Sequence, residues 1–299
     1  MLEAIEKLYN EPLSRHSSFK IGGEAKAVYF PSSRDEFIEL LLSLKTSGER
    51  YIIIGNGSNI LFDDKGFNGS VIITRKMCDV EYKYDADGVV ISAEAGVKLT
   101  ELSREAGKKH ALTGLEFGFG IPATIGGAIY MNAGAYGGQM ADVVLDIEAY
   151  DIEKNEVVVI DNAGADFSYR HSIFEENKNL VVLSARFRLS HGDINEITNK
   201  MDTNMQSRRD KQPLEFPSAG STFKRPEGYF AAKLIDDAGL KGYTVGGARV
   251  SEKHAGFVIN AGGATSYDVL TLMSDVSAIV KEKFGVELSP EVIYAPYEK

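Results

Sequence analysis

Small residues gather at the point where an apolar strand pattern stops. The run Tyr51–Ile54 is apolar, and the pattern resumes at Ile60 after the turn Gly55, Asn56, Gly57, Ser58 and Asn59. Such a turn presents backbone amides and hydroxyl groups to an anion. It is not the loop of a P-loop nucleotide hydrolase, because no Gly-Lys-Ser/Thr follows. The glycines of a single turn of this kind more often serve only to reverse the chain and pack closely. The prediction of a phosphate site therefore depends on further segments.

Two further segments have the same character. Residues 118–123 formally match the G-x-G-x-x-G/A pattern, but no strand of the required kind precedes them, so we do not predict a Rossmann dinucleotide site there. The stretch Pro217–Pro226 holds three hydroxyl residues and two cations within ten residues. An exposed turn is the alternative interpretation of that stretch, since lysine and arginine are usually solvated.

Composition excludes several classes of function. The 299 residues include 33 Lys+Arg and 43 Asp+Glu, a net charge of −10 that argues against nucleic acid as a partner. The lone cysteine, Cys78, excludes an internal disulfide framework. The histidines, at 16, 110, 171, 191 and 254, lack metal-site spacing, so we expect no metal.

From the amino-acid pattern we also expect no targeting signal. The N-terminal residues lack the basic region and apolar core of an export signal, which favours a cytoplasmic protein. Residues 117–141 carry no charge, but their seven glycines, with Pro122, Asn132 and Gln139, make a membrane span unlikely to form, so we predict no membrane partner.

The elements that must position these segments alternate between strand and helix patterns, which predicts an α+β fold. We expect strands at 27–30, 51–54, 71–74, 80–84, 89–93, 143–150, 157–160 and 180–189, with a hairpin turn at 85–88. We expect helices at 35–44, 99–110, 193–209, 231–237 and 266–284. The last helix is expected to bury the stripe Tyr267, Leu270, Met273, Val276, Val280 and Phe284.

At these segments the chain resembles the UDP-N-acetylenolpyruvoylglucosamine reductase (MurB) family. The resemblance extends over almost the whole sequence. Its motifs are His16–Gly23, Gly55–Asn59, Gly120–Pro122 through Gly126-Gly127 to Asn132–Gly137, Tyr169–Phe174, Ala219–Pro226 and Ser251–Phe257.

The resemblance implies a two-lobed FAD-binding fold of the FAD-linked oxidase/reductase type, with a smaller α+β substrate-binding domain. It places the FAD-binding domain at 1–195, with sublobes at about 1–76 and 77–195, and the substrate-binding domain at 196–299. The last strand is expected to return to the FAD lobe. The implied activity is reduction of the enolpyruvyl ether of UDP-N-acetylglucosamine enolpyruvate to UDP-N-acetylmuramate. FAD is bound without a covalent link and NADPH is the electron donor. That reaction serves peptidoglycan synthesis, and so cell wall biogenesis, cell shape and division. A monomer is compatible with the sequence, which does not set the oligomeric state.

Roles for individual residues follow from the same resemblance. It implies that Arg170 stabilises the developing enolate, that Ser221 donates the proton, and that Glu291 supports the enol. Lys211, Lys224 and Arg225 are the implied substrate contacts. The implied cofactor contacts are Gly55, Asn56, Gly57, Ser58, Asn59, Gly120, Ile121, Pro122, Gly126, Gly127, Asn132, Gly134 and Ala135.

The sequence departs from the family in two places. Ala123 stands where the family usually has glycine, which matters only if that residue has a positive φ. The segment 175–180 is short where longer members insert a tyrosine-bearing loop, so the chain resembles the compact subtype.

Two other functions fit the same residues. An FAD-dependent alcohol or sugar oxidase of the same fold needs no serine acid, and it passes electrons to oxygen. A non-catalytic nucleotide-sugar binding protein could use the same glycine turns and cations, but it is colourless and turns nothing over. Colour and turnover therefore discriminate among the three.

Overall fold

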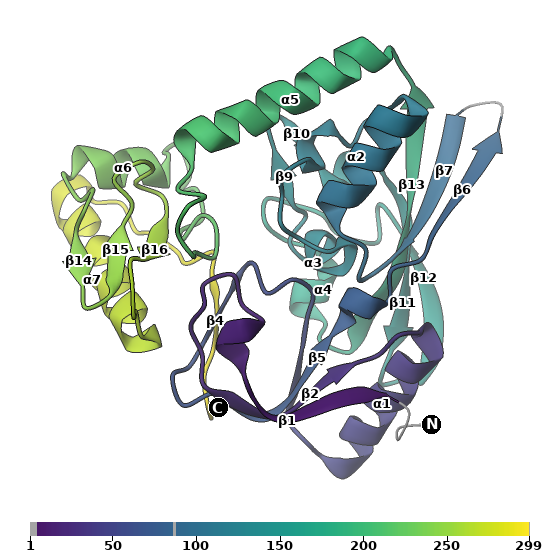
Figure 1. The fold of residues 1–299 in the computed structure, drawn as a ribbon, viewed down its shortest axis with the longest axis horizontal. Helices are drawn as coiled ribbons and strands as arrows, with labels where there is room; N and C mark the ends of the chain where they lie inside the picture. Colours follow the sequence, from purple (N-terminus) through teal and green to yellow (C-terminus); the bar gives the residue numbers. More distant parts are fainter. Residues whose placement is uncertain (1–4, 86–87, 299) are drawn as a thin grey trace. The chain divides into compact units, whose positions relative to one another are not determined.

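A computed structural model describes residues 5–85 and 88–298 of the chain (Figure 1). It divides into two compact units, each built from segments that are distant in sequence. Unit 1 comprises Met1–Lys7, Tyr29–Asn56 and Val71–Ser207, and unit 2 comprises Leu8–Val28, Gly57–Ser70 and Arg208–Lys299. The expected boundary near residue 195, between an FAD-binding domain and a substrate-binding domain, stays a prediction.

The principal sheet of unit 1 is antiparallel. Its strand order is β12-β11-β13-β7-β6, with β8 also paired to β13. The strands are β6 (Val80–Asp85), β7 (Gly88–Glu94), β8 (Leu112–Thr113), β11 (Val144–Asp151), β12 (Glu156–Asp161) and β13 (Leu180–His191). The expected hairpin is confirmed in its strands, because Asp85 pairs with Gly88, while the turn residues 86 and 87 lie outside the described residues.

Helices α2 (Leu99–His110) and α3 (Ile125–Tyr130) pack on this sheet (Figure 1). They share one apolar core with the inward side chains of the strands, such as Ile91 and Phe187. A 3-10 turn at Glu116–Gly118 and the short pair β9 (Gly134–Ala135) and β10 (Gly138–Gln139) lie in the glycine-rich region between α2 and β11. Further short helical segments are α4 (Ile173–Glu176) and 3-10 turns at Leu13–Arg15, Thr74–Lys76 and Met140–Asp142.

Helix α1 (Arg34–Ser47) begins and ends where its sequence dictates. The Ser33 hydroxyl accepts a hydrogen bond from the amide of Glu36, and Gly48 takes the left-handed conformation that ends the helix. Its buried residues, among them Phe37 and Leu41, form a second core with strand residues of unit 1. A separate sheet has the order β1-β2-β5-β3, with β1 (Glu6–Pro12), β2 (Glu24–Phe30), β3 (Tyr51–Ile54) and β5 (Phe67–Ile73).

The core of unit 2 lies among two helices and a three-stranded sheet. Helices α6 (Ala231–Asp237) and α7 (Ser266–Phe284) pack with β14 (Thr244–Val245), β15 (Ala248–Val250) and β16 (Val258–Asn260). The last strand, β17 (Ile293–Ala295), pairs in parallel with β4 (Ile60–Phe62). Helix α5 (Ile194–Lys211) precedes this region in sequence.

One expectation about α7 is wrong. Tyr267 is 72% exposed and Phe284 is 38% exposed, so neither belongs to the buried stripe. The apolar residues of α7 that are buried are Val269, Leu272, Met273, Val276 and Val280. Both sets have helical spacing, and the pattern alone does not say which one the sheet covers.

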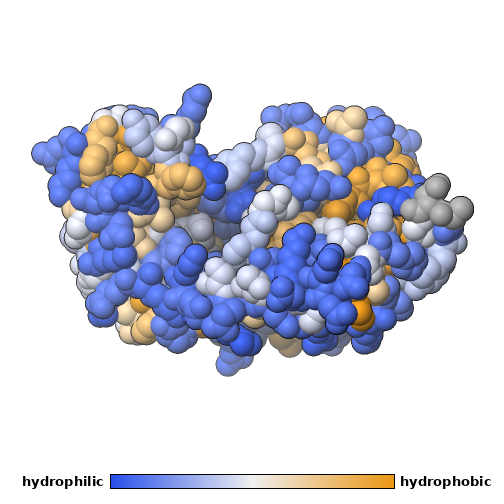
Figure 2. Space-filling model, turned by 90° about the horizontal axis from the view of Figure 1, so that it is seen from above, coloured by the Kyte–Doolittle hydropathy of each residue, from blue (hydrophilic) through white to orange (hydrophobic). Residues whose placement is uncertain are grey.

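The residues at the surface are mostly polar. Figure 2 shows one face, on which hydrophilic residues (blue) predominate and hydrophobic ones (orange) are interspersed. Within the described ranges, no helix is both long and apolar enough to cross a lipid bilayer.

Candidate functional site

The turn at 55–59 leaves β3 with backbone amides open to a ligand. Among the described residues, none accepts a hydrogen bond from the amides of Asn56, Gly57 or Ser58. Gly57 has φ +63°, and a Cβ there would lie 2.1 Å from the carbonyl oxygen of His16. Any side chain at Gly57 is therefore excluded by both conformation and space. Unpaired amides in a glycine turn suit the phosphate oxygens of a cofactor.

A second predicted segment, residues 120–127, approaches this turn within unit 1. The side-chain amide of Asn56 donates to the carbonyl oxygen of Pro122 at 2.9 Å. A Cβ on Gly55 would lie 1.9 Å from Oγ1 of Thr124, so the glycine permits the close approach. Thr124 caps α3, and sequence reasoning missed its role because only the fold brings it against Gly55.

The backbone amides of this second segment mostly have protein partners. Gly120 donates to Oγ1 of Thr100, and Gly126 donates to the carbonyl oxygen of Ala95. A Cβ on Gly126 would lie 3.1 Å from the Ala95 Cβ, which gives that glycine a packing role. Ala123 is not among the residues with positive φ, so alanine fits there without strain. The predicted cofactor contacts at Gly120, Ile121, Pro122, Gly126 and Gly127 remain predictions.

Asn132 acts first as a structural residue. It is 1% exposed, and its amide donates to Oε1 of Gln139 and to the carbonyl oxygen of Ser168. Its Oδ1 accepts from the amide of Ala141. These bonds fix the loop that carries Gly134 and Ala135, so the structure supports a positioning role for Asn132 near the predicted cofactor contacts.

Arg170 lies at the tip of a tight turn in unit 1. Ser168 and His171 pair with each other on either side of it, and Arg170 itself has φ +55°. Its guanidinium donates to the carbonyl oxygen of Gly134 at 3.4 Å and lies over the ring of Tyr169. The predicted catalytic arginine is therefore next to one predicted cofactor contact.

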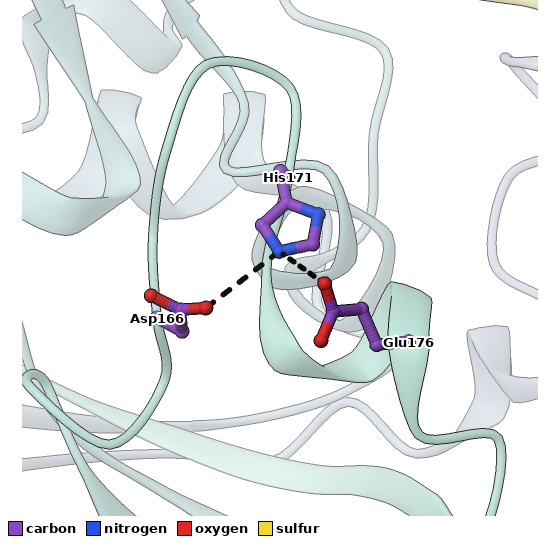
Figure 3. A group of neighbouring side chains, drawn as sticks. All are labelled: Asp166, His171 and Glu176. Carbon is purple, nitrogen blue, oxygen red and sulfur yellow. Dashed lines mark ion pairs between the residues drawn. The ribbon is translucent and has the colours of Figure 1, made fainter.

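The neighbouring histidine is surrounded by carboxylates (Figure 3). Nε2 of His171 lies 3.9 Å from Asp166 and 3.5 Å from Glu176, and Nδ1 lies 3.1 Å from Glu175. The donor atoms of Asp166, His171 and Glu176 all lie within 4.8 Å of one another, a grouping that could hold a metal ion. Asp166 and Glu176 are exposed, and exposed acidic groups commonly gather in this way without a metal ion. These contacts brace the turn that bears Arg170.

Ser221 and Glu291 lie on adjacent backbone segments of unit 2. The amide of Glu291 donates to the carbonyl oxygen of Thr222 at 2.8 Å, and Phe223 bridges to Pro290. Thr222 also fixes the other side of the Ser221 segment. Its amide donates to the carbonyl oxygen of Gly256, and its hydroxyl accepts from the amide of Val258. Two residues that are seventy positions apart in sequence are thereby neighbours.

The predicted substrate cations of unit 2 occupy different settings. Lys224 is half-buried, and its amide donates to the carbonyl oxygen of Ser289, two residues before Glu291. Arg225 is exposed and lies over the ring of Phe230, 4.6 Å from its centroid. Lys211 is exposed at the end of α5. Backbone pairing therefore ties Lys224 to the Glu291 segment.

Two groups near these segments have perturbed pKa values. Burial, together with the hydrogen bond to Asp63, raises the pKa of Tyr294 to about 12, and its hydroxyl donates to that carboxylate. Burial lowers the pKa of His254, whose Nδ1 accepts from the amide of Gly256. A pocket of about 350 Å³ adjoins His254, and its other polar lining residues are Lys233, Asp236, Asp237, Lys241 and Lys253. No sequence signal distinguishes this pocket.

Comparisons with known proteins match both parts of the chain. Residues 25–161 match an FAD binding domain family, and residues 212–295 match the C-terminal domain family of UDP-N-acetylenolpyruvoylglucosamine reductase. The chain is 52% identical to the UDP-N-acetylenolpyruvoylglucosamine reductase of Caldanaerobacter subterraneus subsp. tengcongensis, over 96% of this chain and 93% of that protein. It is 47% identical to the reductase of Caldicellulosiruptor bescii, over 96% of this chain and 90% of that protein.

A solved structure gives the same result for the fold. The crystal structure of UDP-N-acetylenolpyruvylglucosamine reductase (MurB) from Thermus caldophilus superposes with a TM-score of 0.79 at 31% identity. The match covers 98% of this chain and 99% of that one. The predicted α+β FAD-binding fold is confirmed by these matches. The chain belongs to the UDP-N-acetylenolpyruvoylglucosamine reductase family of FAD-dependent oxidoreductases.

Proposed function

We propose that this protein reduces the enolpyruvyl ether of UDP-N-acetylglucosamine enolpyruvate to UDP-N-acetylmuramate, with NADPH as electron donor. The observation that carries the proposal is the end-to-end match to reductases of this name at 52% identity. The structure supports it independently through the backbone pairing that makes Ser221 and Glu291 neighbours.

The residues present fit FAD. The open amides of Asn56, Gly57 and Ser58 suit a diphosphate, and Gly57 leaves no side chain between that group and the backbone. The remaining cofactor contacts are proposed at Gly120–Pro122, Gly126, Gly127, Asn132, Gly134 and Ala135. When bound, FAD supplies a hydride acceptor for NADPH and a hydride donor for the alkene of the substrate.

Side chains of this protein are proposed to stabilise the developing negative charge and to supply the proton. Hydride arrival at the terminal alkene carbon leaves negative charge on the ether-bearing carbon, shared with the substrate carboxylate. Arg170 supplies a planar cation for that charge, and the hydroxyl of Ser221 donates the proton to the carbon. Glu291 supports the enol from the segment adjacent to Ser221. A serine hydroxyl is a weak acid, so its contribution depends on this placement.

Charged side chains of unit 2 are proposed to bind the remainder of the substrate. Lys211, Lys224 and Arg225 face a ligand that carries a carboxylate and a diphosphate. Arginine pairs with phosphate oxygens through two parallel hydrogen bonds, whereas lysine acts as a point charge. We place the reaction in the cytoplasm as part of peptidoglycan precursor synthesis, which fits a chain with one cysteine.

A steady-state assay tests the proposal. NADPH oxidation is followed by its absorbance with UDP-N-acetylglucosamine enolpyruvate as substrate, and the product is identified by mass spectrometry. UDP-N-acetylglucosamine, which lacks the alkene, is the matched control. We expect NADPH oxidation and UDP-N-acetylmuramate with the first compound alone. Oxygen consumption driven by an alcohol or a sugar, with no NADPH oxidation that depends on the alkene, would instead identify an oxidase. A colourless protein that oxidises no NADPH would identify a binding protein.

A further inference from the structure

Asn59 ends the glycine turn, but its side chain is directed at Glu291. Its Nδ2 donates to the carbonyl oxygen of Glu291 at 3.1 Å. Its own carbonyl oxygen accepts from the amide of Ile293 at 3.0 Å, where β17 begins. Both bonds lie within unit 2. The last residue of the turn is therefore joined to the Glu291 segment at two points.

The other side of the Glu291 backbone is also fixed. Its amide donates to the carbonyl oxygen of Thr222, the residue after Ser221. The N–H and the C=O of Glu291 are thus held by two different segments, one carrying Ser221 and the other ending the turn at Asn59. A residue whose backbone is held at both ends has its Cα–Cβ direction fixed, and this direction sets where the carboxylate can reach.

We propose that Asn59 is a positioning residue for Glu291, and that its side chain serves the reduction of substrate rather than the binding of flavin. This inference rests on the proposed catalytic role of Glu291. It reassigns the side chain of Asn59 from the set of cofactor contacts to the support of the carboxylate. The backbone of the turn remains part of the phosphate site.

Loss of the hydrogen bond between Asn59 and Glu291 should have a measurable effect on the rate of substrate reduction. Glu291 acts on a substrate atom only when its carboxylate is within hydrogen-bond reach, and a misplacement of about 1 Å can cost about 10²-fold in rate. Without the Asn59 amide, the Glu291 carbonyl loses its protein donor from this turn. The segment between Ser289 and Ile293 can then relax, and Glu291 moves with it.

Asn56 provides a contrast within the same turn. Its side-chain amide also donates to a carbonyl oxygen, but that oxygen belongs to Pro122 in the second cofactor segment. Two asparagines of the same chemistry, three positions apart, therefore brace different parts of the site. We infer that Asn56 serves cofactor binding and that Asn59 serves the carboxylate.

A double-mutant cycle tests the proposal. The flavin of the purified holoenzyme is reduced with NADPH under nitrogen, and the rate of its reoxidation by UDP-N-acetylglucosamine enolpyruvate is measured. The four proteins are wild type, Asn59→Ala, Glu291→Gln and the double variant, all at saturating FAD. Glu291→Gln keeps the backbone carbonyl that Asn59 contacts. The control is Asn162→Ala, which removes amide hydrogen bonds to Ala141 and Val144 elsewhere in the chain.

If Asn59 acts through Glu291, Asn59→Ala slows reoxidation about 10- to 100-fold. In the Glu291→Gln background it has no further effect beyond about twofold. Asn162→Ala is expected to lower the unfolding temperature but to leave reoxidation within about twofold of wild type. Loss of bound flavin at saturating FAD in both Asn59→Ala and Asn59→Ser, which keeps a donor group, would assign the side chain to flavin binding and overturn the proposal; if only Asn59→Ala loses flavin, Asn59→Ser takes its place in the cycle.

The contrary results are distinct. If the rate of the double variant is lowered by the product of the two single effects, Asn59 acts independently of Glu291. That result overturns the proposal. An unchanged rate in Asn59→Ala, with Glu291→Gln slow, overturns it while leaving the proposed function intact. A wild-type rate in Glu291→Gln removes Glu291 from the catalytic set, and with it both claims.

Discussion

At the scale of single residues, the sequence offered residue types but not their proximity. Ser221, Arg170 and Glu291 are common charged or polar residues, and spacing alone favours solvated side chains for the two charged ones. Family resemblance was needed to select them. The structure adds the physical link for one pair, because Thr222 and Glu291 share a backbone hydrogen bond. It also shows a contact that no motif indicates, because the side-chain amide of Asn59 donates to the carbonyl oxygen of Glu291.

Ser221→Ala should divide the reaction into two parts. The hydroxyl is needed only when the substrate is protonated, so reduction of the flavin by NADPH should stay near the wild-type rate. Turnover should fall by about 10²–10⁴-fold, the usual contribution of a positioned general acid. Stopped-flow absorbance measures the two half-reactions separately. A variant slowed equally in both would assign Ser221 to folding or cofactor binding.

Arg170→Ala should weaken stabilisation of the enolate. The expected loss in the substrate half-reaction is about 3–4 kcal/mol, as for removal of an oxyanion donor. Arg170→Lys should restore it only in part, because an ammonium group cannot reproduce the planar guanidinium. Rapid-mixing reoxidation rates for the three proteins test this order. Wild-type reoxidation in Arg170→Ala would remove the residue from the proposed catalytic set.

At the scale of elements, periodicity predicted where helices and strands occur better than which faces they bury. The helix at 99–110 and the helix at 266–284 have the expected bounds. The buried face of the second was wrong at Tyr267 and Phe284, since two stripes of apolar residues share helical spacing. Turn geometry is more informative, because a glycine with positive φ and no room for a Cβ has few substitutes.

Gly57→Val should give a colourless protein. The substitution combines a strained left-handed conformation with a collision against the carbonyl oxygen of His16, and the turn must move away from the cofactor phosphates. Gly48→Val is the matched control, because Gly48 has φ +68° with nothing within 4 Å of a built Cβ. That control carries about 1–2 kcal/mol of backbone strain and should keep its flavin. Full flavin content in Gly57→Val, read from the visible spectrum, would move the phosphate site elsewhere.

Asp268 should stabilise α7 in a pH-dependent way. It is in a capping box with Thr265, and backbone hydrogen bonds from Thr265 and Gly247 lower its pKa from the usual 3.8. The folded state therefore favours the ionised form, and this stabilisation is complete above pH 3.8 and is lost as pH falls through the lowered pKa.

Asp268→Asn should accordingly reduce the free energy of unfolding at pH 7 by about 0.3–1 kcal/mol. The difference from wild type should shrink as the pH falls below about 4. Urea unfolding followed by circular dichroism measures it, with Glu282→Gln at an exposed position of the same helix as the control. A difference that is constant with pH would show that the charge of Asp268 is not responsible.

At the scale of the whole molecule, the function was predictable because the motifs span the chain in order, and the relatives match over the same length. The compact units were not predictable from sequence. Leu8–Val28 and Gly57–Ser70 belong with Arg208–Lys299, although they precede it by more than a hundred residues. Pairing between distant segments, such as β17 on β4, leaves no local pattern in the sequence. The division into an FAD-binding domain at 1–195 and a substrate-binding domain at 196–299 stays a prediction.

We propose that one flavin passes electrons from NADPH to an enolpyruvyl ether. This proposal is tested most directly by following flavin absorbance of the purified protein under nitrogen. One equivalent of NADPH per flavin is added first, and UDP-N-acetylglucosamine enolpyruvate is added once the yellow colour has bleached. We expect the second addition to restore the oxidised spectrum without oxygen, with one equivalent of UDP-N-acetylmuramate formed per flavin. A flavin that stays reduced until air is admitted, with no product formed, would contradict it.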